Sequence, residues 1–145
     1  MSSEHAENLA AQTVRAERFE LVDGQGKVRA ALKMTAEGPA LALFDALGKT
    51  RVVLNVDADG PGLSLHDAGG EARACLFARA NGPGLSLSDP DAAGEPRVFL
   101  TVRADGPLLA LLDAAGKTRV VLNVDADGPG LSLSDEKGKT IKSLP

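Results

Sequence analysis

The chain has 145 residues, a formal net charge of −4, four Phe, and neither Trp nor Tyr. This length suits one domain with its own core, which Leu, Val and Ala must supply. The net negative charge argues against a surface built for nucleic acid, and the apolar runs are too short for a membrane span. We therefore expect neither nucleic acid nor membrane as a partner.

The N-terminal segment differs in composition from the rest of the chain. Residues 2–18 are rich in Ala and Glu and contain neither Gly nor Pro. Ser2 or Ser3 is a suitable cap for a short helix, but a frayed polar tail fits equally well. The segment lacks the basic and apolar regions of a secretory signal. We predict a helical or disordered tail over 1–18, a repeat domain over 19–145 and, by default, a cytoplasmic location.

From Phe19 onward the chain repeats a unit of about 22 residues. The sequence GKTRVVLNVDADGPGLSL occurs at 48–65 and again at 116–133. Six units share a D-x-x-G motif, which begins at Asp23, Asp45, Asp67, Asp91, Asp113 and Asp135. Five units also share a Gly-Pro pair, at Gly38, Gly60, Gly82, Gly106 and Gly128. The sixth unit is therefore truncated.

Between these markers, apolar and polar residues alternate. Leu-x-Leu follows each Gly-Pro, and a second alternating set such as Val52, Leu54 and Val56 follows each D-x-x-G motif. A period of two bounded by Gly, Pro and Asp is typical of strands. Asp and Gly in D-x-x-G suit a type I turn, and the Pro of Gly-Pro is expected to end one ladder before the next strand begins. Each unit is thus predicted to contain two strands and two turns, giving about twelve strands in all.

Two all-β architectures accommodate such units: an antiparallel meander of hairpins and a β-solenoid with two strands per rung. The solenoid would stack Arg51 on Arg73, and directly opposed like charges are destabilising. The meander needs loops of even length to keep all Leu and Val on one face. With even loops, Leu43 would lie opposite Thr50, Leu41 opposite Val52 and Leu63 opposite Val56. We favour the meander.

A single sheet with one Leu/Val face must bury that face. Twelve strands would enclose too much space for a barrel filled by these side chains. Exact repetition instead favours a symmetric assembly of copies, and we predict a homotrimer shaped as a three-sided β-prism. The predicted oligomer interface consists of Leu41, Leu43, Val52, Leu54, Val56, Leu63, Leu65, Leu85, Leu87, Val120, Leu122 and Val124.

No cluster of residues predicts catalysis, a cofactor or a metal. The D-x-D-G turns at Asp57 and Asp125 resemble the start of a calcium loop, but Gly-Pro-Gly-Leu follows where further ligands would be needed. His66 has no partner at metal-ligand spacing, and Cys75 has no activating neighbour. We therefore expect a non-enzymatic protein.

One set of charged residues has an alternative interpretation. An arginine lies three residues after the glycine of five D-x-x-G motifs: Arg29, Arg51, Arg73, Arg97 and Arg119. These residues would form a stripe able to bind an anionic polymer or a glycan. Acids outnumber bases by 20 to 16, so pairing with turn carboxylates is the simpler interpretation.

The pattern F-x-L-V-D-x-x-G-K-x-R-A-x-L at Phe19–Leu32 resembles that of uncharacterised bacterial tandem β-hairpin repeat proteins. The resemblance covers residues 17–142 and implies the repeat but no chemistry. The sequence thus predicts a structural or assembly protein that associates with itself. The alternative is a glycan- or anion-binding module that uses the outward Arg/Ser face.

Overall fold

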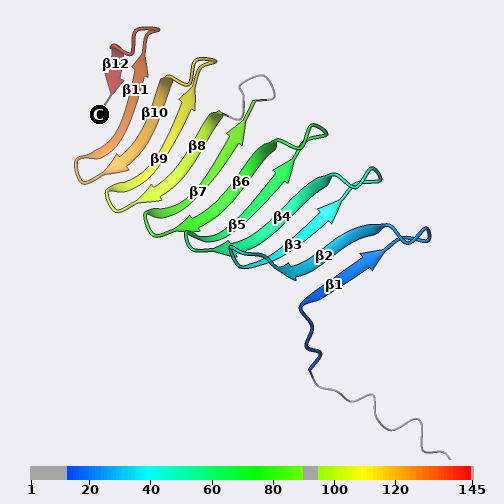
Figure 1. Cartoon of the computed structure of the whole chain (residues 1–145). Coiled ribbons are helices and arrows are strands. Elements are labelled where there is room, and N and C mark those ends of the chain that lie inside the picture. Colours follow the sequence, from blue (N-terminus) through cyan, green and yellow to red (C-terminus); the bar gives the residue numbers. More distant parts are fainter. Residues whose placement is uncertain (1–12, 90–94, 145) are drawn as a thin grey trace, which may run out of the picture.

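The computed structural model describes residues 13–89 and 95–144. Within them, twelve strands form one antiparallel sheet in which every strand lies beside its neighbours in sequence (Figure 1). The strands are β1 (Arg18–Val22), β2 (Val28–Met34), β3 (Pro39–Phe44), β4 (Thr50–Asp57), β5 (Gly60–His66), β6 (Ala72–Arg79), β7 (Gly82–Ser88), β8 (Pro96–Arg103), β9 (Gly106–Leu112), β10 (Thr118–Asp125), β11 (Gly128–Ser134) and β12 (Thr140–Leu144). The prediction of an all-β meander of hairpin repeats is confirmed. All described strand pairs are antiparallel, whereas the solenoid would stack its rungs in parallel.

Part of the N-terminal prediction lies outside the described residues. The segment 13–17, which precedes β1, is not helical, and residues 1–12 are not described. The Asp91–Gly94 turn also lies outside, because residues 90–94 are not described. No helix among the described residues has the length and apolarity needed to cross a membrane.

The D-x-x-G turns combine a five-residue loop with a β-bulge. Phe44 pairs with Thr50 across the turn, but the next pair is Leu43 with Val52, so Arg51 is the extra residue. The predicted pairs of Leu43 with Thr50 and Leu41 with Val52 are therefore wrong. The loop has an odd number of residues, and the bulge adds one further residue, so that Leu43 and Val52 lie on the same face of the sheet. The predicted single apolar face is correct, although the mechanism differs from an even loop.

The Gly-Pro turns are tighter than the sequence suggested. Asp57 pairs with Gly60, so only two residues form the loop, and Pro61 pairs with Val56 inside the ladder. Leu63 consequently pairs with Leu54, and its predicted pairing with Val56 is wrong. A proline is tolerated here because the Val56–Pro61 pair is one of the alternate pairs that exchange no hydrogen bonds, and because the β5–β6 ladder begins only at Gly62, so neither neighbouring strand needs the missing N–H. The expectation that proline would end the ladder is also wrong.

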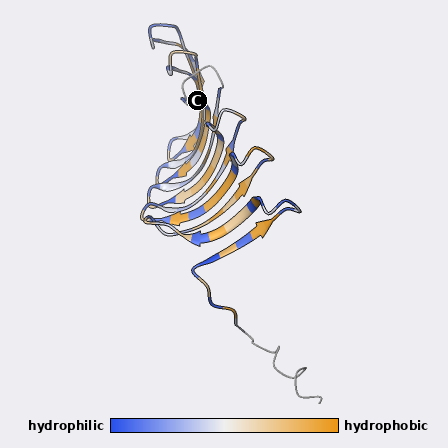
Figure 2. Ribbon diagram, turned by 45° about the vertical axis from the view of Figure 1, so that its right-hand side comes forward, coloured by the Kyte–Doolittle hydropathy of each residue, from blue (hydrophilic) through white to orange (hydrophobic). Residues whose placement is uncertain are grey.

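Burial differs between the two faces of the sheet. The most buried apolar residues are small and share one face: Ala31 is 1% exposed, and Ala42 and Ala110 are each 8% exposed. On the opposite face, Leu54 and Leu122 each remain 49% exposed. The described elements form one twisted layer (Figures 1 and 2), and contacts between strands join sequence neighbours alone. The chain therefore leaves its Leu/Val face without a covering layer among the described elements.

Candidate interaction surface

The Leu/Val face has a continuous central row of large apolar side chains. In each strand pair, the residue of this row lies directly opposite its counterpart, from β1 to β12. The row consists of Phe19, Leu32, Leu41, Leu54, Leu63, Leu76, Leu85, Leu100, Leu109, Leu122, Leu131 and Leu144. We call the face that carries this row the leucine face. Direct cross-strand pairing of apolar side chains stabilises each hairpin and also builds one uniform surface.

Two flanking rows complete the leucine face. On one side Leu alternates with Val or Ala, as in the successive pairs Leu43–Val52 and Leu65–Ala74. On the other side Pro alternates mainly with Val or Ala, as in the pair Val56–Pro61. Across these rows in the described strands, Lys142 of β12 is the one charged residue. The surface is thus almost wholly apolar and has its largest side chains along the middle.

All twelve residues of the predicted interface lie on the leucine face. The prediction omitted several residues that the register places in the central row, including Leu32, Leu76, Leu100, Leu109 and Leu131. The repeat in the sequence was sufficient to find these leucines, because each occupies the middle position of its own alternating apolar segment. A surface depression of about 270 Å³ extends over strands β4 to β7, and its lining includes Leu54, Pro61, Leu63, Leu76, Ala78 and Pro83.

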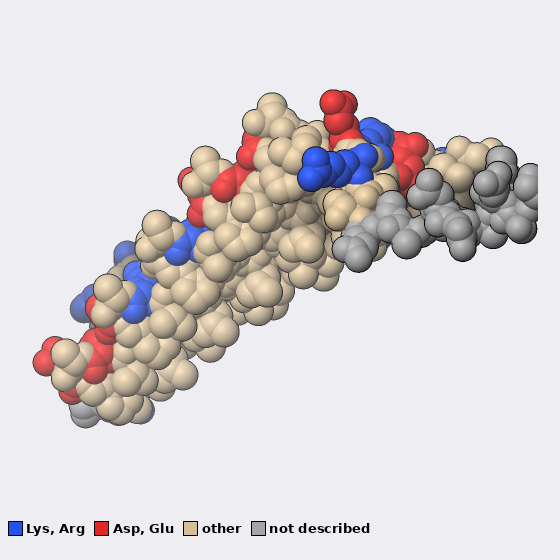
Figure 3. Space-filling view, turned by 90° about the horizontal axis from the view of Figure 1, so that it is seen from below, with Lys and Arg blue, Asp and Glu red and all other residues tan. Residues whose placement is uncertain are grey.

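Charged side chains gather at the D-x-x-G turns. Charged residues also occur at the Gly-Pro turns, and in the view of Figure 3, from below, where these turns face the reader, charged side chains follow one margin of the molecule and leave a broad uncharged area beside it. The Asp45 Oδ1 atom accepts hydrogen bonds from the backbone N–H groups of Leu47 and Lys49. The N–H of Gly48, which has a φ of 82°, donates to the Asp45 carbonyl. Asp and Gly are therefore needed to shape the turn, as predicted for a type I turn.

Each arginine of the series is the extra residue of a bulge. A bulge redirects a side chain, and here it allows ion pairing with an aspartate of the same turn. Arg73 lies 2.6 Å from Asp67, and Arg119 lies 2.5 Å from Asp113. Arg97 contacts Asp89 at 3.0 Å, and Arg29 lies 4.0 Å from Asp23.

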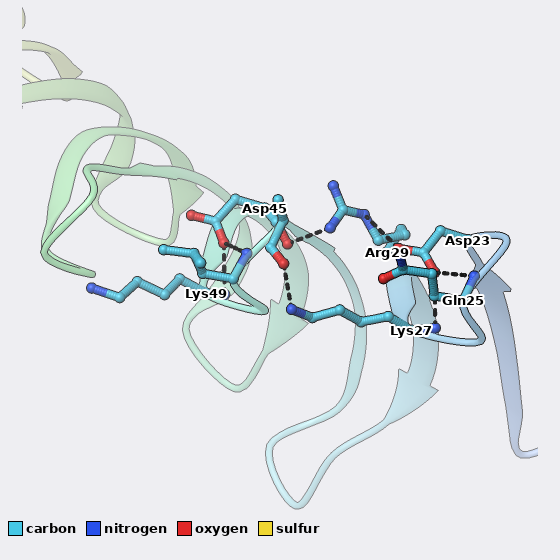
Figure 4. A network of polar contacts seen from close by, with 8 residues as sticks. Asp23, Gln25, Lys27, Arg29, Asp45 and Lys49 are labelled. Atoms are coloured by element: carbon cyan, nitrogen blue, oxygen red, sulfur yellow. Dashed lines mark hydrogen bonds and ion pairs between the residues drawn. The ribbon is translucent and has the colours of Figure 1, made fainter.

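Cations at the D-x-x-G turns also tie each repeat to the next one. Arg29 Nη1 donates to the carbonyl of Asp45 at 2.7 Å, and Lys27 Nζ donates to the carbonyl of Ala46 (Figure 4). Lys49 repeats the lysine contact with Ala68 at 2.7 Å. These cations thus bind carbonyls and carboxylates of their own chain. The contacts favour a structural role for the arginine series over binding of an external anion.

Arg51 is the exception in the series. Its Nη1 atom is shielded from solvent and makes no hydrogen bond. Its charge nevertheless helps to lower the pKa of Asp45, after the larger effect of the hydrogen bond from the Lys49 backbone. One shielded atom in a partly exposed side chain does not define a binding site.

The remaining candidates for chemistry have local partners. His66 joins Ser64 through Nε2 at 2.9 Å and the carbonyl of Gly70 through Nδ1 at 3.0 Å. The Asp57 carboxylate accepts hydrogen bonds from the Asn55 side chain and the Asp59 backbone. Cys75 is a half-buried free thiol. Residues 13–89 and 95–144 contain no group of three His, Cys, Asp or Glu placed to hold a metal ion.

Comparison with protein-family models and with curated proteins found no match. The functional interpretation therefore depends on the geometry of the surfaces described above.

The turn carboxylates make stability depend on pH. Hydrogen bonds from the Lys27 and Lys117 backbones lower the pKa values of Asp23 and Asp113, and the Arg73 side chain does so for Asp67. A carboxylate with a lowered native pKa stabilises the fold above its unfolded pKa and loses that contribution as pH falls through the native pKa. We expect the free energy of unfolding to decrease as pH falls below about 4, the pKa of an unperturbed Asp.

Urea denaturation at pH values between 2 and 7 measures this dependence. Asp67→Asn serves as the comparison, because its amide keeps an acceptor but does not titrate. We expect a shallower decrease in stability below about pH 4 for this variant. Equal slopes for both proteins would show that Asp67 does not contribute to the effect.

Proposed function

We propose that the protein is a non-enzymatic structural or assembly module that associates with copies of itself through the leucine face. The observation that carries this proposal is the exposure of the central leucines, with Leu54, Leu76 and Leu122 between 49% and 53% exposed. Soluble proteins seldom expose a contiguous apolar patch of more than a few hundred square ångströms. The leucine face, which runs the full length of the sheet, exceeds that limit.

The size of the face fits a protein interface. Twelve strands at a spacing of about 4.8 Å extend for about 58 Å, and three alternate residue rows span about 14 Å. The resulting area is about 800 Å², which matches the share that one partner contributes to a stable interface. A second copy offers the same repeat spacing, so leucines of one copy find equivalent gaps along the whole length of another.

The distribution of side-chain size supports three copies around a common axis. The interior of a triangular prism is deepest opposite the middle of each side and shallow at the corners. Leucine occupies the middle row, and Pro, Val and Ala are frequent at the margins, as in Val56, Pro61 and Ala74. A homotrimeric prism would thus place the largest side chains where the most space is available.

Solution mass measured by light scattering over a hundredfold range of concentration tests the proposal. We expect a mass of three chains at the lowest concentrations, because burial of three such faces gives tight association. A constant mass of two chains would keep self-association and reject the trimer. A monomer at every concentration would reject the proposal, and binding of lipid vesicles by that monomer would indicate a different occupant of the face.

A further inference from the structure

The two outermost described strands leave open sheet edges. Strand β1 pairs with β2 alone and β12 pairs with β11 alone, and every residue of both strands is exposed. Each strand therefore has one side on which backbone N–H and C=O groups find no partner strand among the described residues. Such edges are templates for pairing with another chain.

The two edges are complementary in the order of the repeat. Strand β12 follows a D-x-x-G turn, as β4 and β10 do, whereas β1 precedes such a turn, as β5 and β11 do. Inside the sheet, a strand that follows a D-x-x-G turn is always followed by a strand that precedes such a turn. The strand that would continue the pattern beyond β12 is therefore equivalent to β1.

One chain does not join its own two edges in this structure. Strands β1 and β12 lie at opposite ends of the sheet (Figure 1). Eleven inter-strand steps at about 4.8 Å separate them by about 53 Å. Strand β1 of the same chain therefore does not complete β12.

We propose that β12 of one copy pairs antiparallel with β1 of a second copy, so that the sheet continues from chain to chain. The internal β10–β11 pair gives the register, because Leu122 lies opposite Leu131 and Val121 opposite Ser132. The equivalent positions place Leu144 opposite Phe19 and Ser143 opposite Glu20 of the second copy. The central row of the leucine face then continues across the junction without interruption.

The lysine contacts at the turns support the same arrangement. Lys27, Lys49 and Lys117 each donate to a carbonyl 19 residues further along the chain. Lys139 occupies the fourth equivalent position, and its Nζ atom makes no hydrogen bond within residues 13–89 and 95–144. In the continued sheet, the carbonyl at the equivalent position is that of Gly24 in the second copy.

The junction differs from the internal ones at two positions. Lys142 replaces the valine found at Val120, and Ile141 replaces the arginine found at Arg119. A lysine on the apolar face and the loss of one arginine contact both weaken edge pairing. The junction is therefore weaker than the pairing inside a chain, and Lys142→Val should strengthen it.

A disulfide cross-link tests the register. The variant Ser143→Cys/Glu20→Cys, made in a Cys75→Ser background, places two thiols directly opposite each other between copies. Directly opposed residues in antiparallel strands have Cα atoms about 5.5 Å apart, within the range of a disulfide. Mild oxidation should then yield a ladder of covalent multimers on a denaturing gel, and Lys142→Val should increase its yield at least twofold.

The matched control is Lys142→Cys/Glu20→Cys in the same background, because these side chains point to opposite faces of the sheet. We expect at least tenfold fewer multimers from the control. Equal yields from the two variants, or no multimers from either at high concentration, would overturn the proposal. The cross-link reports on the sheet edges alone, so its failure is distinguishable from a failure of association through the leucine face, which the solution mass reports.

Discussion

The double variant Leu54→Lys/Leu122→Lys is expected to shift the solution mass from that of an oligomer to that of one chain. Both residues lie in the central row, and each is 49% exposed in the isolated chain. In the proposed assembly, each substitution would bury a charge without a partner, which costs several kcal/mol. In a single chain, by contrast, the long side chain keeps its ammonium in water. Light scattering gives the mass, and circular dichroism checks that the β-sheet persists.

Leu47→Lys is the matched control for this variant. Leu47 lies in a D-x-x-G turn outside the leucine face and is 78% exposed, more than either leucine of the double variant. We expect its mass to equal that of the unmodified protein. An unchanged mass for Leu54→Lys/Leu122→Lys would show that another surface mediates the association. If the solution mass of Leu47→Lys also fell to that of one chain, the loss of association would not depend on the leucine face.

Gly60→Ala is expected to destabilise the fold far more than Gly128→Ala, although both residues occur in the sequence DADGPG. Both glycines have a positive φ, 121° for Gly60 and 115° for Gly128. A side chain in such a conformation costs about 1–3 kcal/mol at either position. A Cβ atom at Gly60 would additionally lie 2.3 Å from the carbonyl oxygen of Ala78, whereas one at Gly128 would meet nothing within 4 Å.

The extra cost at Gly60 arises because the carbonyl belongs to backbone that is fixed in the sheet. We expect overpacking of this kind to add about 2 kcal/mol to the loss of stability. Urea denaturation of both variants at one protein concentration measures the difference, since association also contributes to stability. Equal losses for the two variants would mean that backbone strain alone sets the cost.

The sequence was sufficient to predict the strands and their common face. Residues such as Val52, Leu54 and Val56 alternate strictly, and this period determines which side chains point the same way. Turn chemistry was also readable, because Asp45 and Gly48 occupy positions that few other residues tolerate. The leucine face followed from these two local rules.

The register was not predictable to the same degree. A bulge at Arg51 and an even loop give the same face pattern, so alternation alone does not distinguish them. The choice depends on contacts distant in sequence, such as those of Arg29 and Lys27 with the next turn. A proline within a strand, Pro61, likewise misled the prediction: its pair with Val56 exchanges no hydrogen bonds and the β5–β6 ladder starts only at Gly62, so its missing N–H is not needed on either side.

Contacts in the described sheet join each strand only to its neighbours in sequence. Such a molecule behaves as a one-dimensional chain, whose stability is the sum of unit and neighbour terms. Opening should begin at the outermost strands and spread inward, so amide hydrogen exchange would be slowest near β6 and β7. Length is then an adjustable quantity, because each 22-residue unit would lengthen the sheet by about 9.6 Å without a new kind of contact. The length of the sheet is thus set by the number of repeat units in the chain.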